Sequence, residues 1–445
     1  MLGLGESGEA AARLLVEENA MVTILDSADL KKIRSKIERI TPLGVAILAG
    51  AEAGSHVPDY DLAVLSPGID PASPLVQNFL RKRIDMIGEL EFAFELCVCP
   101  VVAITGTNGK TTTTQLVEQM LNACGVKTVA AGNIGPAFSS VVKQSPQLDL
   151  MTLEVSSFQL EAVRSFRPHI AVWLNFAADH LDRYATMDDY RHAKLRIFEN
   201  QTAEDFAVVN LRDLRAGTLD RRGREPRRIA TRARLVTFSA YVPGADFDFR
   251  DGAIFYRGQK VLAMRDTNLR GLHNAENLMA ALGVGVAHGL DFNRMRPPLC
   301  AYKPLPHRCE LVRTIDSVAY VNDSKATNLD ALEKALLSET CPVVLIAGGK
   351  DKGFEFDSIA ELVAQKAHHV VLIGEMAGRI ERMWGARVPC VQAGSLSGAI
   401  ALARQRSRPG DVVLFSPGTS SFDMFQNYED RGDQFRAIVQ AMTEK

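Results

Sequence analysis

Short apolar segments alternate with helix-like segments along most of the 445-residue chain. Each apolar segment has the length of a buried strand and falls far short of a membrane span. Regular alternation of such strands with helices is typical of parallel sheets that are covered by helices on both faces. The sequence therefore predicts an α/β fold built from doubly wound domains with mostly parallel sheets. The clearest candidate strands are residues 22–25, 62–65, 170–174, 343–346 and 370–373.

A strand, a glycine-bearing loop and a helix follow one another near residue 105. The apolar segment 100–102 precedes the run Ala103-Ile104-Thr105-Gly106-Thr107-Asn108-Gly109-Lys110-Thr111-Thr112, and a helix-like stretch comes next. In such an arrangement, loop N–H groups and the helix N-terminus face the phosphates of a nucleoside triphosphate. Lys110 would neutralise their charge, and the Thr111 hydroxyl would bind Mg²⁺. Ile104 stands where the standard pattern has glycine, so this loop is a variant.

Charge and cysteine content exclude several classes of protein. The 51 basic and 53 acidic residues give a net charge of −2, which predicts no nucleic-acid partner. No apolar run approaches membrane-spanning length, and the N-terminus lacks a signal pattern, so we expect a cytoplasmic protein without a membrane partner. Cys97-Val98-Cys99 has no second cysteine pair to complete a zinc site. We therefore expect the seven cysteines to be reduced and structural.

The chain opens on a second glycine-rich turn, Gly3-Leu4-Gly5-Glu6-Ser7-Gly8, and Asp26 lies 18 residues beyond Gly8. This spacing fits a nucleotide-binding turn with an acidic residue that reaches a ribose or a base. A turn that merely starts a helix is the alternative. The strand that should precede the glycines is reduced to Met1-Leu2, which indicates a start codon assigned too far downstream or a truncated chain. We expect the turn to be poorly supported, because such a strand is normally buried on both faces.

Polar residues follow several of the predicted strands, where α/β domains place their ligands. Glu154 ends the probable strand 148–153 and offers Mg²⁺ an oxygen ligand. His180 lies between Asp179 and Asp182 after another strand, which favours a site role over a structural one. Lys194 follows on a predicted helix.

Three further loops, at 322–328, 348–353 and 416–423, each follow a predicted strand in the last third of the chain. Arg308 is suited to a two-point phosphate contact, and Lys325 and Lys352 to anionic ligands. Each of these lysines has a solvated surface position as its alternative.

Breaks in the pattern divide the chain into three predicted domains. A helix-like segment at 89–96 closes the first domain, and Pro304-Leu305-Pro306 opens the third. The predicted domains are residues 1–97, 98–303 and 304–445. The Arg-rich stretch 211–234 is expected to form surface structure within the middle domain.

Taken together, the runs 105–111, 132–135 and 322–328 resemble those of the Mur ligases, the ATP-dependent family that builds the peptide stem of bacterial peptidoglycan. The runs 153–161, 306–308 and 416–423 resemble the member that adds D-glutamate to UDP-N-acetylmuramoyl-L-alanine through an acyl phosphate. The resemblance implies a UDP-binding Rossmann-like domain, a central ATPase domain and a C-terminal Rossmann-like domain. It also implies a monomer with ATP as co-substrate, two Mg²⁺ ions and a carbamylated Lys194.

The resemblance assigns roles residue by residue, and Lys110, His180 and Lys194 are the implied catalytic residues. The implied ATP contacts are Gly106, Thr107, Asn108, Gly109, Lys110, Thr111, Thr112, Asn277, Arg308 and Asp323. The implied metal ligands are Thr111, Glu154, His180 and Lys194. The implied UDP-substrate contacts are Gly5, Glu6, Ser7, Asp26, Ser66, Gly68, Asn133 and Ser156. The implied D-glutamate pocket is Thr327, Lys352, Ser421, Phe422 and Tyr428.

One position departs from the family pattern, and three alternative functions stay open. Ala28 stands where related enzymes offer an arginine to the uracil ring, so uracil recognition is the least supported of these roles. A folylpolyglutamate synthase shares the central ATPase and adds glutamate. An ATP-binding sensor would not need a set of candidate metal ligands such as Glu154, His180 and Lys194. A redox enzyme that binds NAD at the first turn would leave the phosphate loop unexplained.

Overall fold

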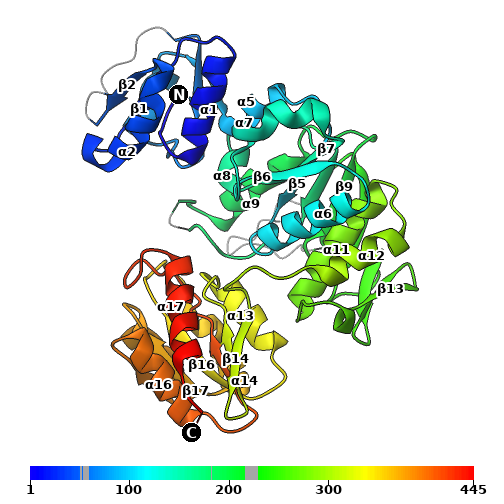
Figure 1. Ribbon diagram of the computed structural model, residues 1–445, viewed down its shortest axis with the longest axis vertical. Helices are drawn as coiled ribbons and strands as arrows, with labels where there is room; N and C mark the ends of the chain where they lie inside the picture. Colours follow the sequence, from blue (N-terminus) through cyan, green and yellow to red (C-terminus); the bar gives the residue numbers. More distant parts are fainter. Residues whose placement is uncertain (51–52, 54–59, 182, 216–228, 445) are drawn as a thin grey trace. The chain divides into compact units, whose positions relative to one another are not determined.

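The computed structural model describes residues 1–50, 53, 60–181, 183–215 and 229–444. The chain packs into two compact units, each assembled from segments that are separated in the sequence. The first contains Met1–Asn175, Asp188–Asp248 and Leu278–Leu299, and the second contains Phe176–Met187, Phe249–Asn277 and Cys300–Lys445. Strands and helices alternate within both units, which confirms the predicted α/β class (Figure 1). The domain boundaries after residues 97 and 303 stay a prediction.

The N-terminal part of the first unit contains two pairs of parallel strands. Strand β1 (Thr23–Asp26) pairs with β2 (Ala46–Ala49), and β3 (Leu62–Leu65) pairs with β4 (Asp85–Gly88). Its helices are α1 (Glu6–Glu17), α2 (Leu30–Ile40), α4 (Pro74–Arg81) and α5 (Glu89–Glu95).

Leu2 joins these two strand pairs, because it forms parallel bridges to both Leu25 and Leu65. The Leu2 N–H donates to Val64 O at 2.8 Å, and Leu2 O accepts from the N–H of Ser66 at 2.9 Å. The expectation that the glycine turn is poorly supported is therefore wrong. Two residues are enough here, because the backbone groups of Met1, Leu2 and Gly3 bond to strands on both sides.

The central part of the first unit is a parallel sheet whose strands run β11-β10-β9-β8-β5-β7-β6. Strands β5, β7 and β8 are buried along their whole length, which explains their continuous apolar sequence. The strands are β5 (Val101–Thr105), β6 (Thr128–Gly132), β7 (Leu150–Glu154), β8 (Ile170–Trp173), β9 (Phe206–Asn210), β10 (Arg234–Ser239) and β11 (Phe247–Arg250). The helices are α6 (Lys110–Ala123), α7 (Phe138–Val141), α8 (Ser157–Leu160), α9 (Met187–Leu195), α10 (Leu211–Arg215), α11 (Leu272–Ala287) and α12 (Phe292–Ala301).

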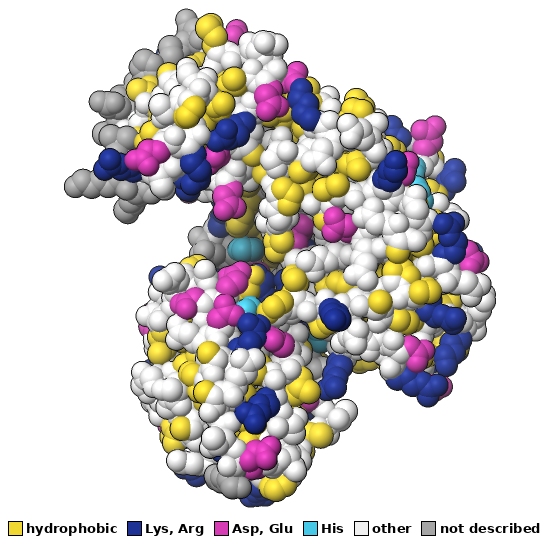
Figure 2. All heavy atoms as spheres, in the orientation of Figure 1, with side chains coloured by type: hydrophobic (Ala, Val, Ile, Leu, Met, Phe, Trp, Pro, Cys, Tyr) yellow, Lys and Arg dark blue, Asp and Glu magenta, His cyan; other side chains and the backbone are white. Residues whose placement is uncertain are grey.

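The Arg-rich stretch 211–234 is described only in part. It starts with α10 and ends at the first residue of β10, whereas residues 216–228 lie outside the described residues. On the face seen in Figure 2, basic and acidic side chains are interspersed, as expected from the balanced composition.

The second unit contains a sheet in the order β14-β15-β19-β16-β17-β18. Only the β14–β15 pair is antiparallel in this sheet, and the other pairs are parallel. The strands are β14 (Glu310–Ile315), β15 (Val318–Asn322), β16 (Val343–Gly348), β17 (Ala367–Ile373), β18 (Cys390–Gln392) and β19 (Val412–Phe415). The helices are α13 (Leu329–Ser338), α14 (Ala360–Lys366), α15 (Ala377–Trp384), α16 (Leu396–Arg406) and α17 (Tyr428–Ala441). An antiparallel hairpin, β12 (Ala253–Tyr256) and β13 (Gln259–Ala263), also lies in this unit.

This sheet is buried on both faces. In β16, Val344 and Ile346 belong to one core cluster, whereas Leu345 and Ala347 belong to the cluster on the opposite side. Because neighbouring residues of a strand point to opposite faces, both faces need apolar residues, and the strand reads as an unbroken apolar run. No helix among the described residues is long and apolar enough to cross a membrane.

Candidate active site

The phosphate loop connects β5 to α6 in the conformation that its glycines predict. Gly106 has φ +156° and Gly109 has φ +86°, and both values favour glycine. A Cβ on Gly106 would lie 2.9 Å from the Cβ of Leu174, so the loop also lacks space for a side chain there. Lys110 starts α6, and its Nζ donates to Gly106 O and Thr107 O at 2.9 Å each.

Asn175 anchors this loop, and sequence reasoning assigned it no role. Its Oδ1 accepts from the Asn108 N–H at 2.8 Å, and its Nδ2 donates to Asn108 O at 2.9 Å. Its backbone carbonyl also accepts from the Thr107 N–H at 3.0 Å. The sequence offered one indication of this role: Asn175 lies just after β8, the strand that neighbours β5 in the sheet.

Glu154 is the last residue of β7. Its side chain is buried, and within the part of the chain that the structure describes only one of its two carboxylate oxygens accepts a hydrogen bond. Asn133 Nδ2 donates to Oε1 at 2.9 Å, whereas Oε2 has no hydrogen-bond partner among the described residues. The residue is 1% exposed. A buried carboxylate oxygen without a donor is costly unless a cation or a proton completes it. The first unit therefore offers an oxygen that fits a Mg²⁺ ion, with the Thr111 hydroxyl in the same unit.

Lys194 is a second lysine that contacts the phosphate loop. It lies on α9, is 1% exposed, and its Nζ donates to Gly106 O at 2.9 Å. The same carbonyl accepts from Lys110, so two lysine nitrogens converge on one oxygen. The Lys194 nitrogen also lies 4.9 Å from the centre of the Tyr190 ring. Sequence reasoning did not predict this shared carbonyl.

His180 belongs to the second unit, whereas Thr111, Glu154 and Lys194 belong to the first. His180 has φ +55°, a left-handed conformation that is uncommon outside glycine. The preceding Asp179 accepts from Lys352 Nζ at 2.9 Å and from Asn328 Nδ2 at 3.1 Å. Burial opposes ionisation of Asp179, but the charges of Lys352 and His180 and the hydrogen bonds from Lys352 and Asn328 together outweigh it and hold the pKa below its usual value. Asp182 lies outside the described residues.

The three loops that follow β15, β16 and β19 lie together in the second unit. Backbone hydrogen bonds join Gly418 N–H to Ala326 O at 2.9 Å and Lys350 N–H to Ser420 O at 2.9 Å. Thr327, Lys352 and Ser421 are therefore carried on connected segments. Phe422 is 67% exposed, and the Tyr428 ring packs 3.7 Å from Lys325 Nζ.

Arg431 lies beneath these loops, and sequence reasoning missed it. Its guanidinium is fully buried and donates to Ser324 Oγ at 3.0 Å, to Ser324 O at 2.8 Å and to Thr419 O at 3.3 Å. Burial lowers its pKa to about 10. Local sequence gave no sign of this, because an arginine among Asp430 and Asp433 on a helix is typical of a solvated face.

The implied ATP contacts of the second unit are largely buried. Asp323 accepts from Ser416 Oγ at 2.8 Å and from the Cys309 N–H at 3.1 Å. Burial raises its pKa to about 6 despite these donors. Asn277 donates to Asn274 Oδ1 at 3.0 Å, and Arg308 is half-buried.

The implied UDP-substrate contacts lie in the first unit, and two of them also hold the backbone. Asp26 accepts from the N–H groups of Leu4 and Ala28, each at 2.7 Å. Ser156 caps α8 in a reciprocal pair with Gln159. The others range from buried to exposed: Ser66 is buried, Gly5 and Ser7 are half-buried, and Glu6, Gly68 and Asn133 are exposed.

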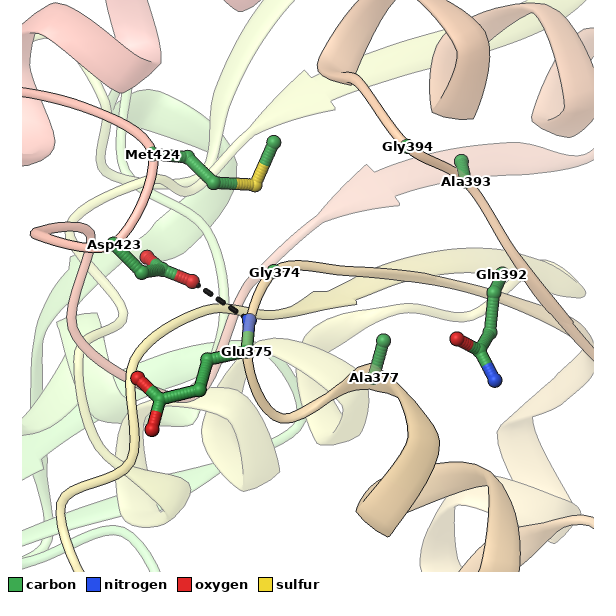
Figure 3. A pocket seen from close by; sticks show the side chains of 8 residues that line it. All are labelled: Gly374, Glu375, Ala377, Gln392, Ala393, Gly394, Asp423 and Met424. Carbon is green, nitrogen blue, oxygen red and sulfur yellow. Dashed lines mark hydrogen bonds between the residues drawn. The ribbon is translucent and has the colours of Figure 1, made fainter.

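A separate cavity of about 530 Å³ opens at the carboxyl ends of β17 and β18 (Figure 3). Asp423 and Glu375 lie on one side of it and Gln392 on the other, and Asp423 Oδ2 accepts from the Glu375 N–H at 2.9 Å. None of the residues assigned from the sequence lines this cavity.

The sequence and the fold of this chain resemble those of known proteins. Family models match residues 1–88 (Mur ligase MurD-like, N-terminal domain), 104–285 (Mur ligase middle domain) and 307–418 (Mur ligase, glutamate ligase domain). A UDP-N-acetylmuramoylalanine–D-glutamate ligase of Geotalea uraniireducens is 41% identical, with 99% of this chain and 97% of that protein covered. The enzyme of the same name from Pelotomaculum thermopropionicum is 39% identical, with 99% and 96% covered.

Solved structures show the same fold at low identity. A pseudomurein peptide ligase type C from Methanothermus fervidus has a TM-score of 0.61 at 16% identity, with 99% of both chains covered. The UDP-N-acetylmuramate-alanine ligase MurC from Thermotoga maritima has a TM-score of 0.60 at 18% identity, with 99% of this chain and 98% of that chain covered. The predicted resemblance is thus confirmed along the whole chain, which belongs to the Mur ligase family.

Proposed function

We propose that this protein joins D-glutamate to UDP-N-acetylmuramoyl-L-alanine, with hydrolysis of ATP to ADP and phosphate. The observation that carries the proposal is the full-length identity of about 40% to ligases that bear this name. We propose that it acts in the cytoplasm, because its substrates are a UDP-sugar and ATP, and as a monomer, as the family resemblance implies. We also propose the three-domain division 1–97, 98–303 and 304–445.

Lys110 and the phosphate loop act in the first step, in which the substrate carboxylate attacks ATP. The N–H groups at the start of α6 and the Lys110 ammonium face the triphosphate and hold its γ-phosphorus in line with the attacking carboxylate. As the terminal alanine carboxylate of the UDP-sugar attacks, Lys110 stabilises the charge that passes to ADP. The product of this step is an acyl phosphate.

Residues of the second unit position the amino acid for the next step. Lys352 and the hydroxyls of Thr327 and Ser421 offer a cation and donors to the two carboxylates of D-glutamate. The amine of the bound D-glutamate then attacks the acyl phosphate, and phosphate leaves as the amide forms. Tyr428 and Phe422 provide apolar surface beside the pocket.

The proposal includes two Mg²⁺ ions, as the family resemblance implies. Thr111 and Glu154 would hold one ion, and the oxygen without a donor on Glu154 supports this assignment. His180 and a carbamylated Lys194 would contribute to the other. When bound, the ions neutralise negative charge on the phosphates and on the attacking carboxylate.

The shared carbonyl of Gly106 supports carbamylation of Lys194. Two ammonium groups that converge on one oxygen repel each other, and burial increases the cost. Addition of CO₂ to the neutral amine would replace one of these charges with an anion, which attracts Lys110 and suits a hard cation. Lys194→Ala should lose activity that short carboxylates partly restore, whereas Lys127→Ala, which alters an exposed lysine of the same unit, should retain activity.

The direct test is phosphate release from ATP in the presence of UDP-N-acetylmuramoyl-L-alanine, with D-glutamate compared against L-glutamate. Release that requires both the UDP-sugar and D-glutamate supports the proposal. Release with L-glutamate and a folate would instead support the folylpolyglutamate synthase alternative. ATP binding without turnover on any acceptor would support the sensor, and reduction of NAD would support the redox enzyme.

The amino-acid pocket has its own test within the same assay. Lys352→Ala should raise the KM for D-glutamate far more than the KM for ATP, because the lysine is assigned to a D-glutamate carboxylate and to no atom of ATP. Equal changes in the two KM values would contradict this assignment.

A further inference from the structure

Two cysteines lie in contact on the segment that connects α5 to β5. The Sγ atoms of Cys97 and Cys99 are 3.9 Å apart, and the Cys97 thiol also donates to Cys99 O at 3.4 Å. Both residues are half-buried, and Val98 between them is 72% exposed. The pair is therefore at the surface, where a small reagent can reach it.

Neighbouring groups distinguish the two thiols. The hydrogen bond from Cys99 lowers the pKa of Cys97 to about 7, and Ser145 contributes to the same effect. The hydrogen bond to Cys97 raises the pKa of Cys99 instead, and burial and Asp149 add to this shift. The Cys97 thiol, which donates to Cys99 O in the structure, therefore ionises more readily than the Cys99 thiol. Since the thiolate is the nucleophile, Cys97 is the attacking sulfur and Cys99 the resolving one.

The local backbone holds this geometry without a disulfide. The Cys97 N–H bonds to Phe94 O at 3.0 Å, and the Val98 N–H bonds to Ser145 Oγ at 3.2 Å. A disulfide requires the sulfurs to approach from 3.9 Å to about 2 Å. All seven cysteines are free thiols in the structure, so this pair is in its reduced form.

We propose that Cys97 and Cys99 form a modification site that a low-molecular-weight disulfide oxidises to an intrachain disulfide. The Cys97 thiolate attacks one sulfur of the reagent and forms a mixed disulfide, and one small thiol leaves. Cys99 then loses its proton and attacks the Cys97 sulfur, and the second small thiol leaves. Two protein thiols are oxidised and one reagent disulfide is reduced to two thiols. The proposal is independent of the ligase function.

The experiment treats the full-length reduced protein with oxidised glutathione at pH 7.5 and then maps tryptic peptides by mass spectrometry. Residues 84–110 form one peptide that contains both cysteines, and residues 335–350 form another that contains only the exposed Cys341. We expect the first peptide to lose two hydrogen atoms without retaining glutathione, and the second to gain one glutathione. A first peptide that stays reduced, or that keeps glutathione, would overturn the proposal.

Two variants assign the roles of the sulfurs. Cys99→Ser should leave one glutathione on Cys97, because the resolving thiol is absent. Cys97→Ser should slow modification of the peptide at least tenfold at pH 7.5, because burial and the Asp149 carboxylate still disfavour ionisation of Cys99. Equal rates in the two variants would contradict the assigned order. The Cys341 peptide should react equally in both variants, which controls for unfolding.

Discussion

The phosphate loop of the first unit and the loop cluster of the second unit are built in opposite ways. The phosphate loop is one continuous run, from Gly106 to Thr112, whose shape follows from its own glycines and from the start of α6. The loop cluster joins the segments after β15, β16 and β19, which span from Asp323 to Ser421 and are held by Arg431 and by cross-loop backbone bonds.

This difference predicts what mutations will do in each region. In the phosphate loop, the glycines and the Asn175 anchor hold the backbone, so loss of the Lys110 side chain should affect activity more than stability. In an assembled cluster, loss of the side chain that joins the segments should lower both activity and stability. The following predictions test this contrast in order of expected size.

Lys110→Ala should lower kcat/KM about 10³-fold, which corresponds to about 4 kcal/mol, because no other residue of the loop replaces its charge on the phosphates. The urea midpoint of unfolding should change little. Steady-state phosphate release and urea denaturation measure the two effects, with Lys127→Ala as the matched control. A large loss of stability would show that the loop depends on Lys110 for its shape and would break the comparison.

Arg431→Met should destabilise the protein by about 3 kcal/mol, because it leaves the carbonyls of Thr419 and Ser324 buried without their donor. The KM for D-glutamate should rise as the loops separate. Urea denaturation measures the first effect, and Arg382→Met provides an exposed control. An unchanged midpoint with normal kinetics would mean that the loops hold together without the guanidinium.

Asp323→Asn should change the pH dependence of stability. The folded pKa of about 6 lies above the ordinary value of 3.8, so the folded state binds more protons between these values. Its contribution to stability is fully present below pH 3.8 and is lost as pH rises through about 6. The variant should therefore be more stable relative to the parent at pH 7 than at pH 4, by about 2–3 kcal/mol. An equal difference in stability between variant and parent at both pH values would exclude a raised pKa of Asp323.

Asn328→Ser should have the smallest effect. Asn328 caps α13 by accepting from the Ala331 N–H at 2.9 Å, and it donates to Asp179 at 3.1 Å. Serine can retain the cap but loses the amide donor, so we expect a cost of at most about 1 kcal/mol and a modest rise in the KM for D-glutamate. Thermal unfolding measures the loss of stability, and D-glutamate titrations measure the change in KM. A cost as large as that of Arg431→Met would mean that the Asp179 contact is central to the cluster.

The sequence by itself determined the features that depend on near neighbours along the chain. The candidate strands at 170–174, 343–346 and 370–373 were confirmed, because strands buried on both faces must be apolar throughout. The shape of the phosphate loop followed from Gly106 and Gly109. The family was identified from short runs in which the spacing of residues is the signal, and the full-length matches confirmed it.

Only the tertiary structure decided how distant segments support one another. Asn175 locks the phosphate loop from another strand, Leu2 joins two strand pairs, and Arg431 ties two loops from a helix about a hundred residues after Ser324. None of these contacts has a local pattern, because a hydrogen bond between remote residues depends on which strands become neighbours in the sheet. Strand order is set by burial of the whole domain, so the partners of a polar side chain appear only when the fold is complete.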